Sequence, residues 1–198
     1  VTDAFGWPST VTQTLNVADV AATVAPLRGA DLIAGETYSA AGSFTDPGAD
    51  VWSATVNYGD GGGVQPLPLA DKSFAVAHTY ADSGNFTLTV SVSDGGATGT
   101  SSATIGVITP LAATRGLAQQ VQLLAESGAV AGQQVQPLLA SLDAASKQMS
   151  RGYNVPAANE LGAFVNKLTA AVMSGRMSPN AAQQLTAMAT RIERVLNP

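Results

Sequence analysis

The stretch Gly84-Asn85-Phe86-Thr87-Leu88-Thr89-Val90-Ser91-Val92-Ser93-Asp94 decides the fold of the first half of this chain. Its apolar side chains occupy every second position, so one face of a strand is apolar and the other carries hydroxyl groups. The segment 52–58 has the same alternation, with Trp52, Ala54, Val56 and Tyr58 on one face. Strands of this kind, bounded by turns rich in Gly and Asp, predict a β-sandwich.

Turn-forming clusters lie between the predicted strands, at residues 46–48, 59–63, 82–85 and 94–96. Pro66 and Pro68 interrupt the segment that follows the second of these turns. Because proline cannot donate to a β-ladder, we expect an edge strand or an irregular connection there. The aromatic residues at alternating positions are expected to pack in the core of the sandwich: Phe44, Trp52, Tyr58, Tyr80 and Phe86.

The composition changes at Pro110, after which strong helix formers dominate. Thr109 is suited to cap a helix and Pro110 to its first turn. Apolar residues then recur at helical spacing in four groups, which predicts four helices with a core of Leu and Met. A duplication at an offset of 47 residues predicts two related αα-hairpins; it pairs Leu117 with Phe164, Val121 with Leu168, Gly128 with Gly175 and Leu138 with Leu185.

These patterns predict a multidomain chain, all-β and then all-α, with a sandwich over residues 18–108 and a four-helix bundle over residues 109–198. The start of the chain resembles the end of the sandwich, since residues 1–6 match 92–97 and the strand 10–17 matches 101–107. We therefore expect residues 1–17 to be the last strand of a preceding repeat, or a donor strand for a neighbouring copy.

Composition and charge exclude several classes of protein. The 198 residues contain no Cys, which excludes disulfides, thiolate metal sites and a Cys nucleophile. The net charge is −5, and the bases Arg115, Arg151, Arg176, Arg191 and Arg194 are spread singly, which predicts a solvated face and not a nucleic-acid site. No apolar run is long enough to span a bilayer, so we predict no insertion into a membrane. With no signal peptide before Val1, we expect a processed product or a fragment of a longer extracellular protein.

Two motifs of the first half resemble the PKD (polycystic kidney disease) domain. They are Val56-Asn57-Tyr58-Gly59-Asp60-Gly61, and His78-Thr79-Tyr80 followed by a Gly-containing turn and the long alternating strand. The resemblance implies an Ig-like sandwich. Val56 departs from the family pattern, which often has Trp there, and Trp52 is expected to fill that core space.

The second half is similar to the FIMAH module of bacterial secreted proteins, through residues 159–168 and 174–179. Together the two resemblances imply the C-terminal end of a large secreted or cell-surface protein of bacterial origin. They imply a structural or adhesion role as a spacer and protein-interaction unit. The partners would be other domains of the same parent protein or neighbouring copies.

The sequence contains no catalytic constellation. His78 is the single histidine and lies within the His-Thr-Tyr motif, where we expect it to hydrogen-bond the backbone of the sandwich. A lone histidine cannot build a triad, so we predict that the protein is not an enzyme. Asp60 stands between glycines and is expected to serve its own turn.

The PKD resemblance also implies a calcium site, since some family members bind calcium in loops at one end of the sandwich. Asp46, Asp50 and Asp94 are the candidate ligands here. Carboxylates with loop carbonyls suit Ca²⁺, which takes six to eight oxygen ligands. We predict no other cofactor.

The N-terminal segment supplies the candidate interaction residues Trp7, Thr10, Val11, Thr12, Leu15 and Val17. Trp7 either binds a partner or a sugar, or caps the apolar edge of the sandwich. Two alternative functions therefore stand beside the spacer. One is a self-assembling extracellular appendage subunit that donates the strand 10–17. The other is a carbohydrate-binding accessory module, with polysaccharide as the partner and a row of exposed aromatic residues on one face.

Overall fold

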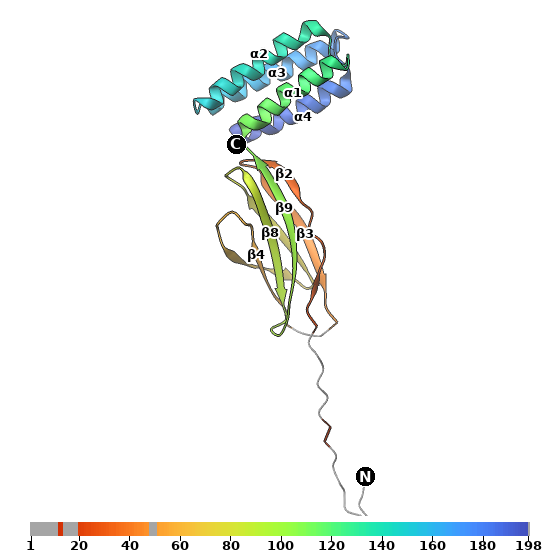
Figure 1. The fold of residues 1–198 in the computed structure, drawn as a ribbon, viewed down its shortest axis with the longest axis vertical. Coiled ribbons are helices and arrows are strands. Elements are labelled where there is room, and N and C mark those ends of the chain that lie inside the picture. The colour runs from red at the N-terminus through yellow and green to blue at the C-terminus, as the bar shows by residue number, and fades with distance from the viewer. Residues whose placement is uncertain (1–11, 14–19, 48–50, 198) are drawn as a thin grey trace, which may run out of the picture.

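The structure is a computed structural model that describes residues 12–13, 20–47 and 51–197. Nine strands precede four helices in this part of the chain (Figure 1). The strands are β1 (Thr23–Val24), β2 (Ala30–Ile33), β3 (Thr37–Thr45), β4 (Ser53–Asn57), β5 (Val64–Leu67), β6 (Leu69–Ala70), β7 (Ser73–Thr79), β8 (Gly84–Ser93) and β9 (Thr98–Ile108). The helices are α1 (Pro110–Glu126), α2 (Gly132–Ser150), α3 (Asn154–Met173) and α4 (Pro179–Leu196). The predicted order of an all-β and then an all-α part is confirmed.

The strands form two facing sheets with the orders β1-β3-β7-β6 and β2-β9-β8-β4-β5. All neighbours are antiparallel except β2 and β9, which run parallel with Ala30 opposite Ile105. Along β8 the side chains of Leu88, Val90 and Val92 are fully buried, as the alternation predicts. The apolar faces of the two sheets pack against each other and make one core of an Ig-like sandwich.

The structure confirms the predicted edge strand at Pro66 and corrects the predicted position of Trp52. Pro66 lies in β5, the outermost strand of its sheet, so its missing donor costs no ladder bond. Val56 is buried in the core, but Trp52 is only half-buried and lies at the rim. It packs edge-on against Phe44, with the ammonium group of Lys72 over its ring. Trp52 therefore covers the end of the core and does not take the place expected of it.

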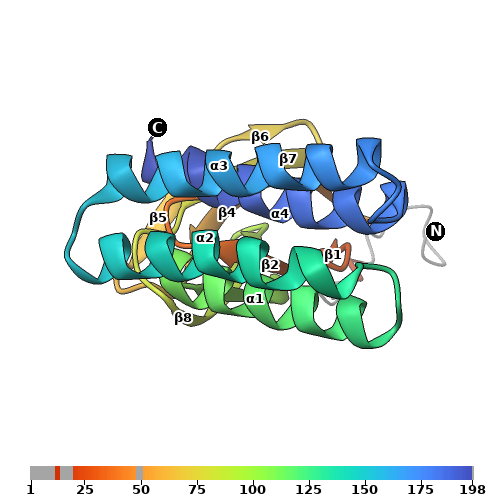
Figure 2. The same ribbon diagram turned by 90° about the horizontal axis from the view of Figure 1, so that it is seen from above.

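The four helices form an up-and-down bundle in which α1 contacts α2 and α4, and α3 contacts α2 and α4 (Figure 2). Thr109 and Ser178 cap α1 and α4 by accepting hydrogen bonds from the amides of Ala112 and Ala181. The fully buried residues include Leu117, Val121, Leu138, Leu161, Phe164, Leu168 and Leu185. Met173 is an exception to the predicted Met and Leu core, because it is 85% exposed.

The repeat at an offset of 47 residues has a geometric counterpart in the bundle. Val130 and Met177, one repeat apart, form a β-bridge between the α1–α2 and α3–α4 loops. The amide of Ala131 donates to the carbonyl of Arg176 at 2.8 Å, and the amide of Ser178 donates to the carbonyl of Ala129 at 3.1 Å. Exchanging the two hairpins turns each of these bonds into the other, so the loops are related by an approximate twofold axis.

Candidate functional site at the junction of sandwich and bundle

The sandwich joins the bundle almost without a linker. β9 ends at Ile108 and α1 begins at Pro110, so Thr109 is the one residue between them. Beside this connection the β2–β3 turn points at α4. The amide of Glu36 donates to the carbonyl of Ile33 at 2.9 Å, and Gly35 provides the left-handed φ of +97° that the turn needs. The amide of Gly35 also donates to the carbonyl of Tyr80 at 2.7 Å, which fixes the turn to the sandwich.

Ile33 carries the apolar contact across the junction. It is the last residue of β2, but its side chain is 1% exposed and belongs to the core of the bundle. Its register partner on β9 is Ile108, which is 48% exposed. The two isoleucines lie side by side in the sheet, and of the two only Ile33 is buried in the core of the bundle.

An ion pair adds a polar contact at the same place. The guanidinium of Arg191 on α4 donates from Nε to Oε1 of Glu36 at 2.9 Å and from Nη2 to Oε2 at 2.6 Å. Nη2 also donates to the carbonyl of Asp31 at 3.2 Å. The carboxylate of Glu36 in turn accepts a bond from the amide of Ile33 at 2.8 Å. This two-pronged geometry fixes the direction of α4 against the turn.

The hydrogen bond from Arg191 holds the pKa of Glu36 below its ordinary value, against the effect of burial, and the same bond raises the pKa of Arg191. The Arg191 side chain is 37% exposed, so solvent screens the pair and its main effect is orientation. The sequence prediction that Arg191 belongs to a solvated face is therefore wrong. Its partner lies 155 positions away in the chain, and no local pattern marks it.

His78 has a carboxylate partner. Its Nε2 lies 2.6 Å from Oδ2 of Asp60, and its ring stacks on Tyr58 with 4.0 Å between the centroids. The expectation of a backbone hydrogen bond is wrong, because the β4–β5 turn brings Asp60 opposite β7. Oδ1 of Asp60 accepts from the amide of Gly62, as expected of a turn residue. That bond, followed by the bond to His78, lowers the pKa of Asp60.

The His78–Asp60 pair ties the two sheets together, because β7 and β4 belong to different sheets. Two tyrosine hydroxyls reinforce this tie. Tyr80 donates to the carbonyl of Tyr58 at 3.0 Å, and Tyr58 donates to the carbonyl of Ala77. Burial raises the pKa of Tyr80 to about 12, so it remains a donor. The two motifs singled out in the sequence thus meet in one structural cluster.

Two of the candidate calcium ligands, Asp46 and Asp94, lie at the end of the sandwich that is remote from the bundle, where β3 and β8 end. The carbonyl of Asp46 accepts from Nζ of Lys72 at 2.8 Å. Oδ1 of Asp94 accepts from the amides of Gly96 and Ala97, so Asp94 caps its turn. Asp50 lies outside the described residues. Within residues 20–47 and 51–197, no group of three or more His, Cys, Asp or Glu side chains is placed to hold a metal. The calcium site stays a prediction.

Most of the candidate interaction residues also lie outside the described part of the chain. They are Trp7, Thr10, Val11, Leu15 and Val17. Thr12 is described, is exposed, and belongs to no strand or helix. The prediction of a leftover or donor strand therefore stays a prediction. None of the helices that the structure describes is long and apolar enough to cross a membrane.

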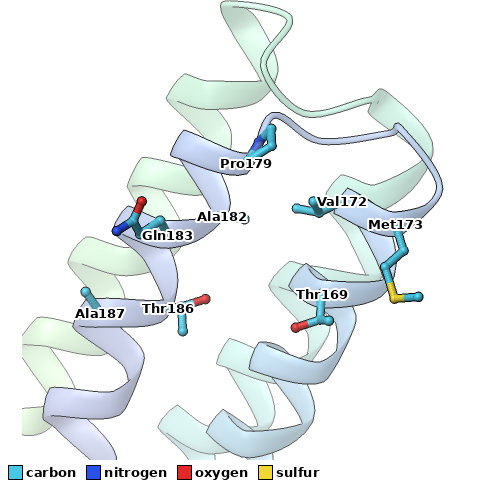
Figure 3. A pocket seen from close by; sticks show the side chains of 8 residues that line it. All are labelled: Thr169, Val172, Met173, Pro179, Ala182, Gln183, Thr186 and Ala187. Carbon is cyan, nitrogen blue, oxygen red and sulfur yellow. The ribbon is translucent and has the colours of Figure 1, made fainter.

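The surface of the bundle carries an apolar groove of about 430 Å³ between α3 and α4 (Figure 3). Val172 and Met173 line one side of it, and Pro179 lies at its end. In the first hairpin the positions of Ala182 and Thr186 are occupied by Val135 and Leu139, which pack against the core. The second hairpin thus has smaller side chains than the first at these two positions of the groove.

The PKD domain family matches residues 5–108. The chain belongs to the PKD family. A FIMAH domain matches residues 114–194, so the PKD sandwich is followed by a FIMAH bundle. Domains of these kinds fit an extracellular structural or adhesion module and are typically non-catalytic.

Solved structures similar to the PKD part are Ig-like domains. Titin domain M7 is 14% identical, with 47% of this chain and 99% of that chain covered and a TM-score of 0.38. The PKD domain of an M14-like peptidase from Thermoplasmatales archaeon SCGC AB-540-F20 is 20% identical, with 44% and 92% covered and a TM-score of 0.35. No curated protein matches the chain.

Proposed function

We propose that this chain is a non-catalytic unit at the C-terminal end of a secreted or cell-surface protein, in which the PKD sandwich and the FIMAH bundle act as one stiff spacer. The observation that carries the proposal is the double attachment at the junction. One attachment is the covalent connection through Thr109. The other is the β2–β3 turn, which contributes Ile33 to the bundle core and Glu36 to the ion pair with Arg191.

Stiffness is what a spacer needs. A single flexible linker leaves relative domain motion as the default for neighbouring domains. Two attachments at different points restrict that rotation, so a partner surface on the bundle would keep a fixed direction relative to the rest of the parent protein. The partners in this proposal are the other domains of that protein or neighbouring copies, and fractionation of the producing cells tests the extracellular location.

The absence of Cys from the sequence makes a direct test of stiffness simple. Spin labels are attached at Thr87→Cys on the sandwich and Gln119→Cys on the bundle, both at exposed positions. Pulsed electron resonance then gives the distribution of distances between the labels. We expect one narrow distribution, which broadens when Ile33→Ala and Glu36→Gln are combined.

Lys147→Gln is the matched control, because it removes the exposed pair of Lys147 with Asp143 and leaves the junction intact. It should leave the distribution narrow. A broad distribution in the unmodified junction would show that the two domains move independently, and the stiff spacer would then be wrong.

A further inference from the structure

A polar groove of about 560 Å³ lies between α3 and α4, on the half of this hairpin that is remote from the apolar groove of Figure 3. Its polar lining consists of Asn159, Asn166, Thr190, Glu193, Arg194 and Asn197. The floor is made of small residues, among them Gly162 and Ala163. These amide, hydroxyl and charged groups come from two adjacent helices and converge on one space.

The sequence of α3 explains why these polar residues face the groove. Asn159, Gly162 and Asn166 are spaced i, i+3 and i+7, which places them on one side of the helix. Leu161, Phe164 and Leu168 lie on the other side and are fully buried in the bundle core. The segment 159–168 thus has one face in the bundle core and one face on the groove. Packing of the bundle explains the residues of the core face but not those of the groove face.

Glu193 is the most telling group in the groove. It is partly buried, and this burial raises its pKa. Within the described part of the chain, its carboxylate has no hydrogen-bond or ion-pair partner. A Cβ atom at Gly162 would lie 3.3 Å from Oε1 of Glu193, so glycine leaves the carboxylate uncrowded at this position. A carboxylate that is partly shielded from water and has no protein partner is open to a ligand that donates a hydrogen bond.

The first hairpin provides an internal comparison, because the repeat places a sister groove of about 530 Å³ between α1 and α2. Arg115 stands there in the position of Gly162, and Ser146 in the position of Glu193. Three bases and one acid line the sister groove. The α3–α4 groove has one acid and one base and is rich in amides, so the two grooves share a backbone and differ in chemistry.

We propose that the α3–α4 groove binds a neutral saccharide. Each sugar hydroxyl both donates and accepts hydrogen bonds, and the amide side chains of Asn159, Asn166 and Asn197 can do both. Glu193 adds a strong acceptor and Arg194 a strong donor. The balance of these two charges favours a ligand without net charge, and the polar lining disfavours an apolar peptide. The groove lies beside the junction on α4, but its lining includes none of Ile33, Glu36 and Arg191, and its proposed binding goes beyond the stiff-spacer function.

The test uses the full chain and a series of neutral tetrasaccharides built from glucose, mannose, galactose, xylose or N-acetylglucosamine, with polygalacturonate as the acidic comparison. Calorimetry measures affinity, and NMR follows the Asn side-chain amides. We expect one of the neutral tetrasaccharides to bind at millimolar concentration or below and to shift the amides of Asn159 and Asn166. Asn166→Ala and Glu193→Gln should each weaken binding about tenfold, the loss expected for one hydrogen bond that involves a charged or well-oriented group.

Two further variants make the result decisive. Gln119→Ala removes an amide at the sister position of Asn166 and should leave affinity unchanged. Gly162→Leu fills the groove with a good helix former, so it should abolish binding while circular dichroism shows an intact bundle. The proposal is overturned if no neutral tetrasaccharide binds, if polygalacturonate is preferred, or if binding survives Gly162→Leu. None of these outcomes depends on the distance distribution at the junction.

Discussion

Replacing Ile33 by alanine should destabilise the helical bundle, although Ile33 belongs to a strand of the sandwich. The side chain is 1% exposed and is surrounded by the bundle core. The substitution removes three carbon atoms, and each buried CH₂ contributes about 0.8 kcal/mol. The transfer contribution is therefore about 2.4 kcal/mol, and the cavity left behind brings the loss of unfolding free energy to about 2–5 kcal/mol.

The assay follows the two domains separately during urea unfolding. Far-UV circular dichroism reports on the four helices, and the fluorescence of Trp52 reports on the sandwich when Trp7 is replaced by Phe in every variant. We expect the midpoint of the helical transition of Ile33→Ala to move to a lower urea concentration. The shift should correspond to the whole loss of unfolding free energy. The transition seen by Trp52 should move less, because the sandwich core keeps all of its own side chains.

Ile108→Ala is the matched control, since Ile108 is the register partner of Ile33 and is 48% exposed. The same three carbons are removed there with half the burial and little cavity, so the loss should be about 1 kcal/mol or less. If Ile33→Ala shifts only the Trp52 transition, or if the two variants cost the same, then Ile33 does not belong energetically to the bundle and our reasoning about the junction fails.

Three further perturbations test local features of the fold. Thr109→Ala removes the cap of α1 and should cost about 1 kcal/mol in the helical transition. Gly99→Ala should cost about 1–3 kcal/mol in the Trp52 transition, because its Cβ would overlap the carbonyl oxygen of Ala22. The folded-state pKa of Asp60 is lowered, so its contribution to stability is complete above the ordinary Asp pKa and is lost as pH falls through the lowered value. Melting temperatures of Asp60→Asn should therefore fall less with acidification than those of the unchanged chain, and equal slopes would show that the bonds of Asp60 to the Gly62 amide and to His78 do not contribute to stability.

The elements of the fold could be predicted because their signals are local. The alternation along residues 84–94 reflects which face of one strand is buried, and β8 has that pattern in the structure. The cap at Thr109 involves an amide three positions away, so sequence alone identifies it. The repeat at an offset of 47 residues can also be recognised in the sequence, because both hairpins bury apolar residues at corresponding positions.

The contacts that position the domains could not be predicted in this way. The partner of Arg191 is Glu36, and nothing in the sequence near either residue marks the pair. The bond between Asp60 and His78 has no local sequence signal either. The sequence indicates only that Asp60 accepts hydrogen bonds within its own turn. Both unpredicted contacts are side-chain pairs between elements that become neighbours only after the chain has folded. Hydrophobic periodicity and secondary-structure propensity carry no information about such pairs.

The two attachments at the junction lie on neighbouring elements and contribute in different ways. α1 and α4 are adjacent helices, and β9 and β2 are adjacent strands. The covalent connection joins β9 to α1, and the turn after β2 contacts α4, so the two attachments lie side by side on neighbouring elements. The ion pair, with the Arg191 side chain 37% exposed, contributes little free energy by itself. The ion pair favours one orientation of the bundle relative to the sandwich among those that the connection through Thr109 allows. The burial of Ile33 then supplies the free energy that stabilises this orientation.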